Sequence, residues 1–553
     1  MKRIMVILLL FVMIGLSFAT RYYVSPAGND TLPGTASQPW RTPGYGSKNI
    51  SSGDTLIILS GDYVMSVYWD DMITPPSGSS GHPTVILGQG ATKPRMRGIG
   101  SLFACVQLPG DAAYITIKNL ELTSVIDTPY TGGCRGGISA ASDADTCVKF
   151  LTFEDIELHR VEDMGINLGG DAKNILFKRC NIHHTAYSCI GGPTAHGMGC
   201  VNVVIDSCYL GYAGWFYDGE DTVTWIWDRP DGMGFEPSQG PIIVRYTTSE
   251  HNMGDGLDSK SKRTTIHHCY VANNYGDGVK LWGDSSFVSN TLIYGTGGGF
   301  DITTPWVLLI IGTNDVNAYF EITNVTMWDS PERPSHYAAS VQYDEPTIPI
   351  TLRMRNVIVM GLRQFYADPI VNVIADHNLF YMNDDDVLIY ANGIDYDSGN
   401  IGSLGAGNIC ANPQFIAPPV WGETGNFHLQ PTSPAINTGA DVSLTDDLEF
   451  RSRPYGAGYD MGCYEWREST RVEQKESKSV WSPIALFSPS SRMLILKSAA
   501  ECDYSIYDIT GKIVGEGKFM DEAKIPFEVP SGIYFAVFQN SQEKRIGKFV
   551  AIR

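Results

Sequence analysis

The sequence lacks three features that would place it in other structural classes. No apolar pattern of helical periodicity is sustained along its 553 residues, which argues against a helical protein. One apolar run stands near the N-terminus and no second one follows, so no membrane span is expected. Basic residues are scarce, since 40 Lys and Arg stand against 60 Asp and Glu. A net charge of −20 argues against nucleic acid as a partner.

The eleven cysteines are too few, at this length, to form a disulfide-rich scaffold. Bridges between Cys134 and Cys147, and between Cys189 and Cys200, are possible in an oxidising compartment. No pair has histidines at the spacing of a metal site. Three other cysteines share one position in successive repeats and are expected to stack as small buried side chains: Cys180, Cys208 and Cys269.

The N-terminus predicts export. Lys2 and Arg3 precede an apolar run at residues 4–16, and a small-x-small site ends at Ala19. This pattern is typical of a secretory signal peptide, which we assign to residues 1–19. We therefore expect a protein that is secreted or attached to the cell surface. We also expect it to be a monomer.

The sequence repeats with a period near 22 residues. Residues 253–258 (MGDGLD) are followed 22 residues later by 275–280 (YGDGVK). Such self-similarity predicts a solenoid, in which each repeat forms one coil on its neighbour. Related hexapeptides are each expected to form a short strand: 117–122 (IKNLEL), 153–158 (FEDIEL), 177–182 (FKRCNI), 205–210 (IDSCYL), 244–249 (VRYTTS), 266–271 (IHHCYV), 288–293 (VSNTLI), 322–327 (ITNVTM) and 354–359 (MRNVIV).

Both ends of the repeat region have a distinct composition. Residues 20–65 (with YYVSPAGND and GDTLIILSGDY) resemble the start of secreted right-handed parallel β-helix proteins that act on polysaccharides. Residues 410–466 (with NPQF, SPAINTG and YDMGCYE) resemble their closing segment. The resemblance implies an all-β protein, with a right-handed parallel β-helix over residues 20–466 that needs a cap at its open edge.

The remaining sequence predicts a second domain. Residues 467–483 are charged and polar, as in a linker, and strand-like runs over residues 484–553 predict a small C-terminal β-sandwich. This part resembles the sorting domain of the type IX secretion pathway, which implies recognition by secretion machinery. An accessory immunoglobulin-like carbohydrate module is the alternative.

The repeat predicts a cluster of charged side chains. If residues 22 apart are neighbours, Phe235, Leu257 and Val279 form an inward column. The outward column that follows is then formed by Glu236, Asp258 and Lys280, with Asp255 beside Asp277 and Lys260 beside Trp282. Carboxylates gathered in this way repel one another unless a proton or a cation bridges them. Oxygen ligands without His or Cys suit Ca²⁺, for which we predict Glu236, Asp255, Asp258 and Asp277 as ligands.

The same segments resemble family 9 polysaccharide lyases. Residues 254–258 (GDGLD) match the family's DDGxD-like calcium segment, and 276–283 (GDGVKLWG) match its GxGxKLGG-like segment. The resemblance implies that Lys280 is the catalytic base and that Asp255 and Asp258 bind calcium. Gly254 stands where the family has an Asp, and Trp282 replaces a Gly.

The expected reaction is β-elimination on a uronic acid of an acidic, pectic polysaccharide. Calcium would stabilise the developing negative charge, and neutral Lys280 would remove the proton. Lys260 or Arg263 could bind a neighbouring uronate, and Trp282, Trp225 and Trp227 could stack on sugar rings. Two alternatives remain: a β-helix glycoside hydrolase that uses paired carboxylates, and a non-catalytic glycan-binding protein.

Overall fold

The structure is a computed structural model. It describes residues 19–125, 131–143, 145–192, 197–214, 230–297, 306–330, 336–343, 347–361, 363–382, 386–468, 484–488, 493–508, 512–527, 529, 532–539 and 544–551. Two compact units, Met1–Arg467 and Glu468–Arg553, divide the chain.

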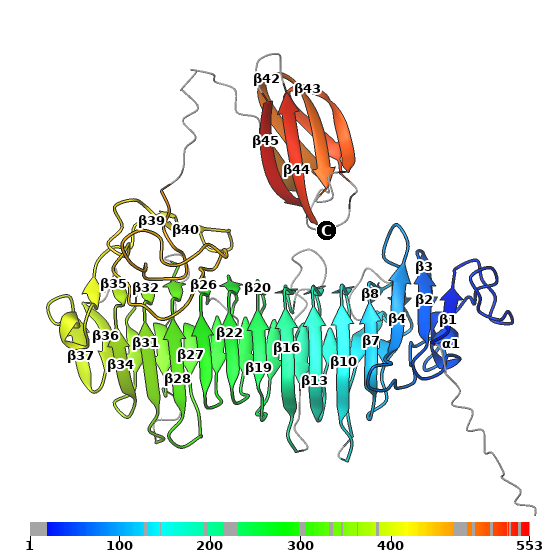
Figure 1. Ribbon diagram of the computed structural model, residues 1–553, viewed down its shortest axis with the longest axis horizontal. Coiled ribbons are helices and arrows are strands. Elements are labelled where there is room, and N and C mark those ends of the chain that lie inside the picture. The colour runs from blue at the N-terminus through cyan, green and yellow to red at the C-terminus, as the bar shows by residue number, and fades with distance from the viewer. Residues whose placement is uncertain are drawn as a thin grey trace, which may run out of the picture. The chain divides into compact units, whose positions relative to one another are not determined.

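The first unit is a right-handed parallel β-helix, which confirms the predicted fold class (Figure 1). Each full coil adds one strand in turn to three long sheets, here called sheets 1, 2 and 3.

Sheet 1 consists, in spatial order, of β1 (Arg21–Val24), β2 (Thr55–Leu59), β4 (Thr84–Gln89), β7 (Ala113–Lys118), β10 (Val148–Glu154), β13 (Ala172–Lys178), β16 (Cys200–Asp206), β19 (Ile242–Arg245), β22 (Thr264–His267), β25 (Ser286–Ser289), β28 (Tyr319–Thr323), β31 (Thr351–Arg355) and β34 (Asn372–Asp376).

Sheet 2 consists of β3 (Asp62–Met65), β5 (Arg95–Gly98), β8 (Glu121–Ser124), β11 (Glu157–His159), β14 (Asn181–His183), β17 (Tyr209–Gly211), β20 (Thr248–Glu250), β23 (Tyr270–Ala272), β26 (Leu292–Tyr294), β29 (Thr326–Trp328), β32 (Ile358–Gly361), β35 (Leu379–Met382) and β38 (Ile409–Cys410).

Sheet 3 consists of β6 (Leu102–Gln107), β9 (Cys134–Ser139), β12 (Ile166–Asn167), β15 (Ile190–Gly192), β18 (Met233–Phe235), β21 (Leu257–Ser259), β24 (Val279–Leu281), β27 (Val307–Ile311), β30 (Tyr337–Val341), β33 (Phe365–Ala367), β36 (Val387–Ala391) and β37 (Ile394–Asp397). Only the pairing of β36 with β37 is antiparallel among the described strands of this sheet.

The repeated hexapeptides are corners rather than single strands, which corrects our expectation. In residues 153–158, β10 ends at Glu154, Asp155 has a φ of 56°, and β11 begins at Glu157. The φ of Asn324 in a later corner is 53°. This left-handed conformation bends the chain sharply, and Asn and Asp tolerate it better than most residues, so a turn interrupts the apolar alternation.

The interior of the helix is a continuous apolar core. Stacked side chains such as Phe153 and Phe177, with ring centroids 5.3 Å apart, repeat from coil to coil. The three stacked cysteines are buried in it as predicted: Cys180, Cys208 and Cys269.

All eleven cysteines are free, so neither proposed disulfide forms. Cys134 on β9 lies beside Cys105 of β6, with 3.4 Å between the sulfur atoms, and it hydrogen-bonds in the core. Cys147 belongs to the turn before β10, and its sequence proximity to Cys134 therefore brings no pairing.

Extra elements lie at the N-terminal end of the coil stack and along sheet 2, so the closing segment does not form the predicted cap over the open edge. At the N-terminal end, helix α1 (Pro43–Lys48) packs near Trp40, whose ring stacks on Tyr22. After β37, η1 (Ile401–Ser403) precedes a closing segment that includes β39 (Phe415–Ala417) and β40 (Asn426–Leu429). This segment packs on sheet 2 over β23–β35 (Figure 1).

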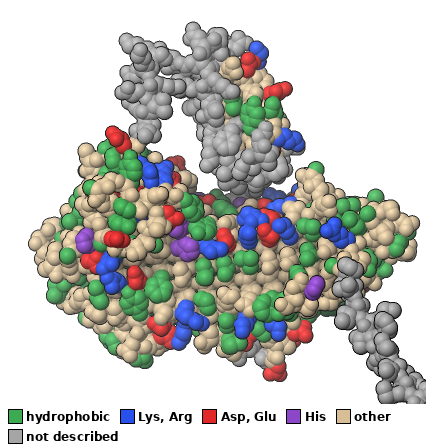
Figure 2. Space-filling model, viewed as in Figure 1, with side chains coloured by type: hydrophobic (Ala, Val, Ile, Leu, Met, Phe, Trp, Pro, Cys, Tyr) green, Lys and Arg blue, Asp and Glu red, His purple; other side chains and the backbone are tan. Residues whose placement is uncertain are grey.

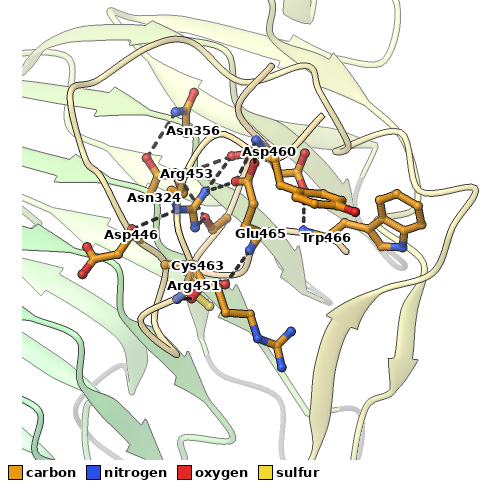
Figure 3. Close-up of polar contacts among 12 residues, drawn as sticks. Asn324, Asn356, Asp446, Arg451, Arg453, Asp460, Cys463, Glu465 and Trp466 are labelled. Atoms are coloured by element: carbon orange, nitrogen blue, oxygen red, sulfur yellow. Dashed lines mark hydrogen bonds and ion pairs between the residues drawn. The ribbon is translucent and has the colours of Figure 1, made fainter. Parts of the chain in front are cut away.

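A buried ion pair holds the end of the closing segment (Figure 3). Arg453 and Glu465 are completely buried, and their charged atoms are 3.0 Å apart. Asn324 and Asn356, at the corners between sheets 1 and 2, donate hydrogen bonds to carbonyl groups of the closing segment. The segment therefore binds the same corner residues that define the repeat.

The outer surface of the β-helix carries mixed charge. Figure 2 shows basic and acidic side chains next to one another on one face. Ion pairs among the described residues include Arg245 with Asp206 and Arg179 with Asp155. Such exposed pairs contribute about 0–1 kcal/mol each, so the core dominates the stability.

The second unit is a small antiparallel β domain. Its strands are β41 (Ile484–Ser488), β42 (Met493–Asp508), β43 (Ile513–Pro526), β44 (Gly532–Gln539) and β45 (Lys544–Ala551). β43 pairs along β42, whose other edge pairs first with β41 and then with β44. The register of β42 against β43 shifts between Ser498 and Cys502, where the other edge of β42 passes from β41 to β44, and the five strands form one sheet.

Candidate active site

Neighbouring strands of sheet 3 bring the predicted base and an acid together. Parallel pairing of β21 with β24 places Asp258 beside Lys280, and Leu257 beside Val279. The two apolar side chains are fully buried, so their charged neighbours point outward. The 22-residue register is therefore confirmed for this pair of coils.

The predicted register is wrong one coil earlier. Met233 rather than Phe235 pairs with Leu257, so the coils are 24 residues apart here. The turn between β18 and β19 is two residues longer than the turn between β21 and β22, because Ile242 pairs with Thr264. A constant period of 22 misses this difference.

Glu236 consequently leaves the predicted outward column. Gly234 takes its place beside Asp258, while Glu236 lies near Lys260, with 2.8 Å between Oε1 and Nζ. Lys260 Nζ is also 3.3 Å from Asp258 Oδ2. Glu236 is therefore linked to the site through Lys260 rather than by facing Lys280.

Lys280 lies between two carboxylates. Its Nζ is 3.3 Å from Asp255 Oδ2 and 3.4 Å from Asp258 Oδ2, and 17% of its side chain is exposed. Burial alone would lower the pKa of Lys280, but the surrounding carboxylates, with Asp255 and Asp258 foremost, outweigh burial and raise it. In this arrangement Lys280 is held as an ammonium ion.

The aspartates of the repeated motif form a ladder along the turns before sheet 3. Asp255 Oδ1 accepts the backbone N–H of Asp277 at 2.8 Å, and Asp277 Oδ1 accepts that of Val307 at 2.8 Å. The predicted stacking of Asp255 and Asp277 is thus confirmed. One oxygen of each carboxylate stabilises the backbone of the next coil.

Sequence reasoning missed the first member of this ladder. Asp231 Oδ1 accepts the backbone N–H of Asp255 at 2.7 Å. Burial and the nearby carboxylates of Asp255 and Asp258 raise the pKa of Asp231. The sequence does contain a signal for Asp231. The pattern Asp-Gly-apolar at residues 231–233 recurs 24 positions later at residues 255–257.

Close packing of these turns explains the glycines of the repeat. A Cβ on Gly256 would lie 2.6 Å from the carbonyl oxygen of Gly278, and one on Gly232 would lie 2.6 Å from that of Gly256. Asn252 donates to Asn274 Oδ1 at 2.9 Å within the same turns. The Asn, Asp and Gly positions of the echo therefore have structural roles.

Asp258 has no comparable structural role. Its Oδ1 is buried and has no hydrogen-bond partner, while its Oδ2 lies near both Lys260 and Lys280. Burial outweighs the two ammonium groups and raises the pKa of Asp258. An unpaired buried carboxylate oxygen is costly, and the hydrogen bonds of the repeat do not account for this one.

The residues present suit a hard cation in chemistry, although they are not gathered as a finished metal site. No group of three or more His, Cys, Asp or Glu among the described residues is arranged to hold a metal ion. The available donors are nonetheless carboxylate oxygens, which Ca²⁺ prefers, and Asp258 Oδ1 is free. A cation that bound Asp255 and Asp258 through their Oδ2 atoms would displace the Lys280 ammonium group.

A pocket adjoins the charged cluster. It has a volume of about 210 Å³ and is lined by Lys260, Lys262, Trp282 and Thr313, among others. The ring of Trp282 lies over Gly312, and a Cβ added to Gly312 would be 2.5 Å from that ring. The centroid of the Trp282 ring is 5.8 Å from Lys280 Nζ. Lys260 and Trp282, two of the predicted substrate contacts, both line this pocket.

Arg263 is not among the residues that line this pocket. Arg263 donates hydrogen bonds to the backbone carbonyls of Gln239 and Gly240, both at 2.8 Å, and so supports a turn. Trp225 and Trp227 lie outside the described residues.

Comparisons with known proteins agree with the fold. A family described as "Right handed beta helix region" matches residues 104–291. No curated protein matches the chain significantly.

Several solved structures share the β-helix at low identity. Pectate lyase Pel9A is 16% identical, with 82% of this chain and 98% of that chain covered and a TM-score of 0.45. XylC in complex with xylose is 10% identical, with 81% of this chain and 98% of that chain covered and a TM-score of 0.46. A rhamnogalacturonan lyase is 14% identical, with 75% of this chain and 97% of that chain covered and a TM-score of 0.38. With TM-scores below 0.5, these likenesses carry no argument about this chain.

None of the helices in the described part of the chain is long and apolar enough to cross a membrane.

Proposed function

We propose that this chain is a carbohydrate-active enzyme that cleaves an acidic, uronate-containing polysaccharide by β-elimination, with Lys280 as the base. The observation that carries the proposal is the position of Lys280. It points outward from sheet 3, between Asp255 and Asp258 and beside the pocket formed with Trp282. A partly exposed amine beside a sugar-sized pocket suits proton abstraction.

In this reaction neutral Lys280 takes the C5 proton of the uronate. The electrons of the C–H bond form the C4=C5 double bond, the C4–O bond breaks, and water protonates the leaving oxygen. Lys260, which borders the pocket, would orient the uronate carboxylate. Trp282 would pack on the sugar ring and exclude water on that side.

We also propose that the site works with Ca²⁺, for which Asp255 and Asp258 would supply carboxylate oxygens and the substrate carboxylate a further ligand. The bound ion would stabilise the negative charge that develops on the uronate carboxylate. With these carboxylates occupied, less negative charge would face Lys280, which favours its neutral form.

Our proposals on location and partners follow from the sequence. The protein would act as a secreted or surface-attached monomer on its polysaccharide, after export through the signal peptide at residues 1–19. Residues 1–18 lie outside the described part of the chain. The C-terminal unit would serve as the module that secretion machinery recognises.

The test uses purified protein with polygalacturonate and with rhamnogalacturonan, and measures the ultraviolet absorbance of unsaturated sugar ends. We expect Lys280→Ala to reduce the rate by about a hundredfold or more, the usual contribution of a general base. Chelation should abolish product formation, and added Ca²⁺ should restore it. Lys178→Ala, on the outer face of sheet 1, is the matched control, because its side chain is also charged and partly exposed. Full activity of Lys280→Ala would remove Lys280 from the mechanism.

One observation favours a second candidate, a glycoside hydrolase. Burial raises the pKa of Asp258, which suits a general acid, while Glu236 is 54% exposed and could act as the partner carboxylate. Reducing ends that form without ultraviolet absorbance, and regardless of chelator, would support this alternative. Tight glycan binding without any product would support a binding protein.

A further inference from the structure

A group of tyrosines lies on the outer face of sheet 3, beyond the strands that carry the charged cluster. Tyr366 of β33 pairs with Tyr390 of β36, and the flanking Phe365 and Ile389 are fully buried. The rings of Tyr337, Tyr366 and Tyr390 stack in sequence, with centroids 5.1 and 5.5 Å apart. Each ring uses its faces to contact the neighbouring coil, so the outer edges of this stack face away from the core.

Tyr343 lies across the edges of this stack. Its ring centroid is 5.9 Å from that of Tyr337 and 5.8 Å from that of Tyr366, with interplanar angles of 59° and 77°. The ring of His336 also lies 6.4 Å from that of Tyr343, at an interplanar angle of 67°. With these three contacts, 41% of Tyr343 is still exposed.

Tyr343 follows the end of β30, close to a residue of the pocket beside Trp282. Ile311 pairs with Val341 at the ends of β27 and β30, and the next residue, Gln342, has a φ of 56° and accepts through Oε1 the backbone N–H of Thr313, which lines that pocket. The strands from β24 to β36 are consecutive neighbours in sheet 3. At about 4.8 Å per strand, the tyrosines extend roughly 10–20 Å along the helix axis from Lys280.

We infer that these tyrosines form a binding surface for sugar units distant from the bond that is cleaved, and that Tyr343 is its main contact. The inference rests on the proposed function for the identity of the polymer. One sugar unit of an extended polysaccharide is about as long as the spacing between strands, so successive sugars can follow successive coils. The C–H face of a pyranose suits the exposed ring of Tyr343, and phenol hydroxyls suit sugar hydroxyls.

Binding is measured in the Lys280→Ala background, so that turnover does not consume the ligand. The probes are polygalacturonate, alginate and a galacturonate disaccharide, with affinity electrophoresis for the polymers and calorimetry for the disaccharide. We expect Tyr343→Ala to weaken binding of at least one uronate polymer about tenfold, as for loss of one aromatic anchor. Disaccharide binding should be unchanged, because the disaccharide cannot span both regions.

Two further variants separate binding from structure. Tyr343→Phe keeps the ring and should retain most of the affinity. Tyr68→Ala removes another exposed tyrosine, 67% exposed and near the N-terminal end of the coil stack, and should change nothing. Thermal unfolding of Tyr343→Ala should match that of the parent protein.

The outcomes distinguish the proposals. Polymer binding that Tyr343→Ala leaves intact overturns the inference, as does a concentration-dependent dimer that only this substitution abolishes. Polymer binding that depends on Tyr343 supports the tyrosine binding surface even if the wild-type protein forms no unsaturated product. The lack of that product would contradict only the lyase reaction.

Discussion

Arg453→Met should detach the closing segment from the β-helix. The buried guanidinium is 3.0 Å from Glu465 Oε2 and donates to the carbonyls of Asp460, Gly462 and Asp446 at 3.2, 2.8 and 3.2 Å (Figure 3). Methionine keeps much of the shape but leaves the buried Glu465 carboxylate without its cation, with only the backbone N–H groups of Tyr455 and Asp460 as donors among the described residues. Removing one member of a buried ion pair costs about 3–5 kcal/mol.

Hydrogen exchange is the appropriate assay, because a solenoid with a separate closing segment need not unfold in one step. The amides of Ala440 and Cys463 report on attachment, since they donate to Asn356 and Thr326 of the helix. A loss of 3 kcal/mol corresponds to exchange that is faster by about a hundredfold or more.

Two variants control this prediction. Arg453→Met combined with Glu465→Gln removes the uncompensated charge and should recover part of the loss. Arg245→Met breaks a partly exposed ion pair and should cost about 1 kcal/mol or less. The reasoning would be refuted if Arg453→Met exchanged no faster than Arg245→Met, or if the double variant were no better than the single one.

Two further predictions concern pH and the pocket. Burial raises the pKa of Asp460 from 3.8 to about 7, so the folded state binds a proton that the unfolded state releases between these values. Protection of the closing segment should therefore fall as pH rises from about 4 to 7, and Asp460→Asn should flatten this dependence; an unchanged profile would contradict the assignment. Gly312→Ala should displace the ring of Trp282 and raise KM several-fold with little change in unfolding temperature. Gly402→Ala, where an added Cβ meets nothing within 4 Å, is the control, and equal KM values for the two variants would exclude a role for the Trp282 wall.

The sequence predicted the fold well because a solenoid repeats its structural requirements. Alternating apolar residues and the 22-residue echo sufficed for the coil stack and for the neighbours Asp258 and Lys280. The prediction that each hexapeptide is one strand was wrong because each turn takes only two residues, of which one, such as Asn324, is left-handed, and the alternation is disturbed only slightly.

The site was predicted less completely because turn lengths vary between coils. Two extra residues between β18 and β19 moved Glu236 toward Lys260 and placed Gly234 beside Asp258. Because of the same two residues, a fixed period of 22 does not align Asp231 with Asp255. The prediction for Arg263 was incomplete for another reason, since the sequence does not show that its guanidinium binds backbone carbonyls.

Repetition itself separates structural residues from candidate functional residues in this protein. Asp231, Asp255 and Asp277 recur because each accepts a backbone N–H of the next coil, so their presence alone is no evidence of chemistry. Asp258 and Lys280 interrupt an outward column that otherwise holds neutral residues on the adjacent strands, including Gly234 before them and Ile310 after them. A stable β-helix needs neither charge there, and the buried Asp258 Oδ1 is left unpaired. The case for a ligand at this site therefore depends on the residues that depart from the repeat.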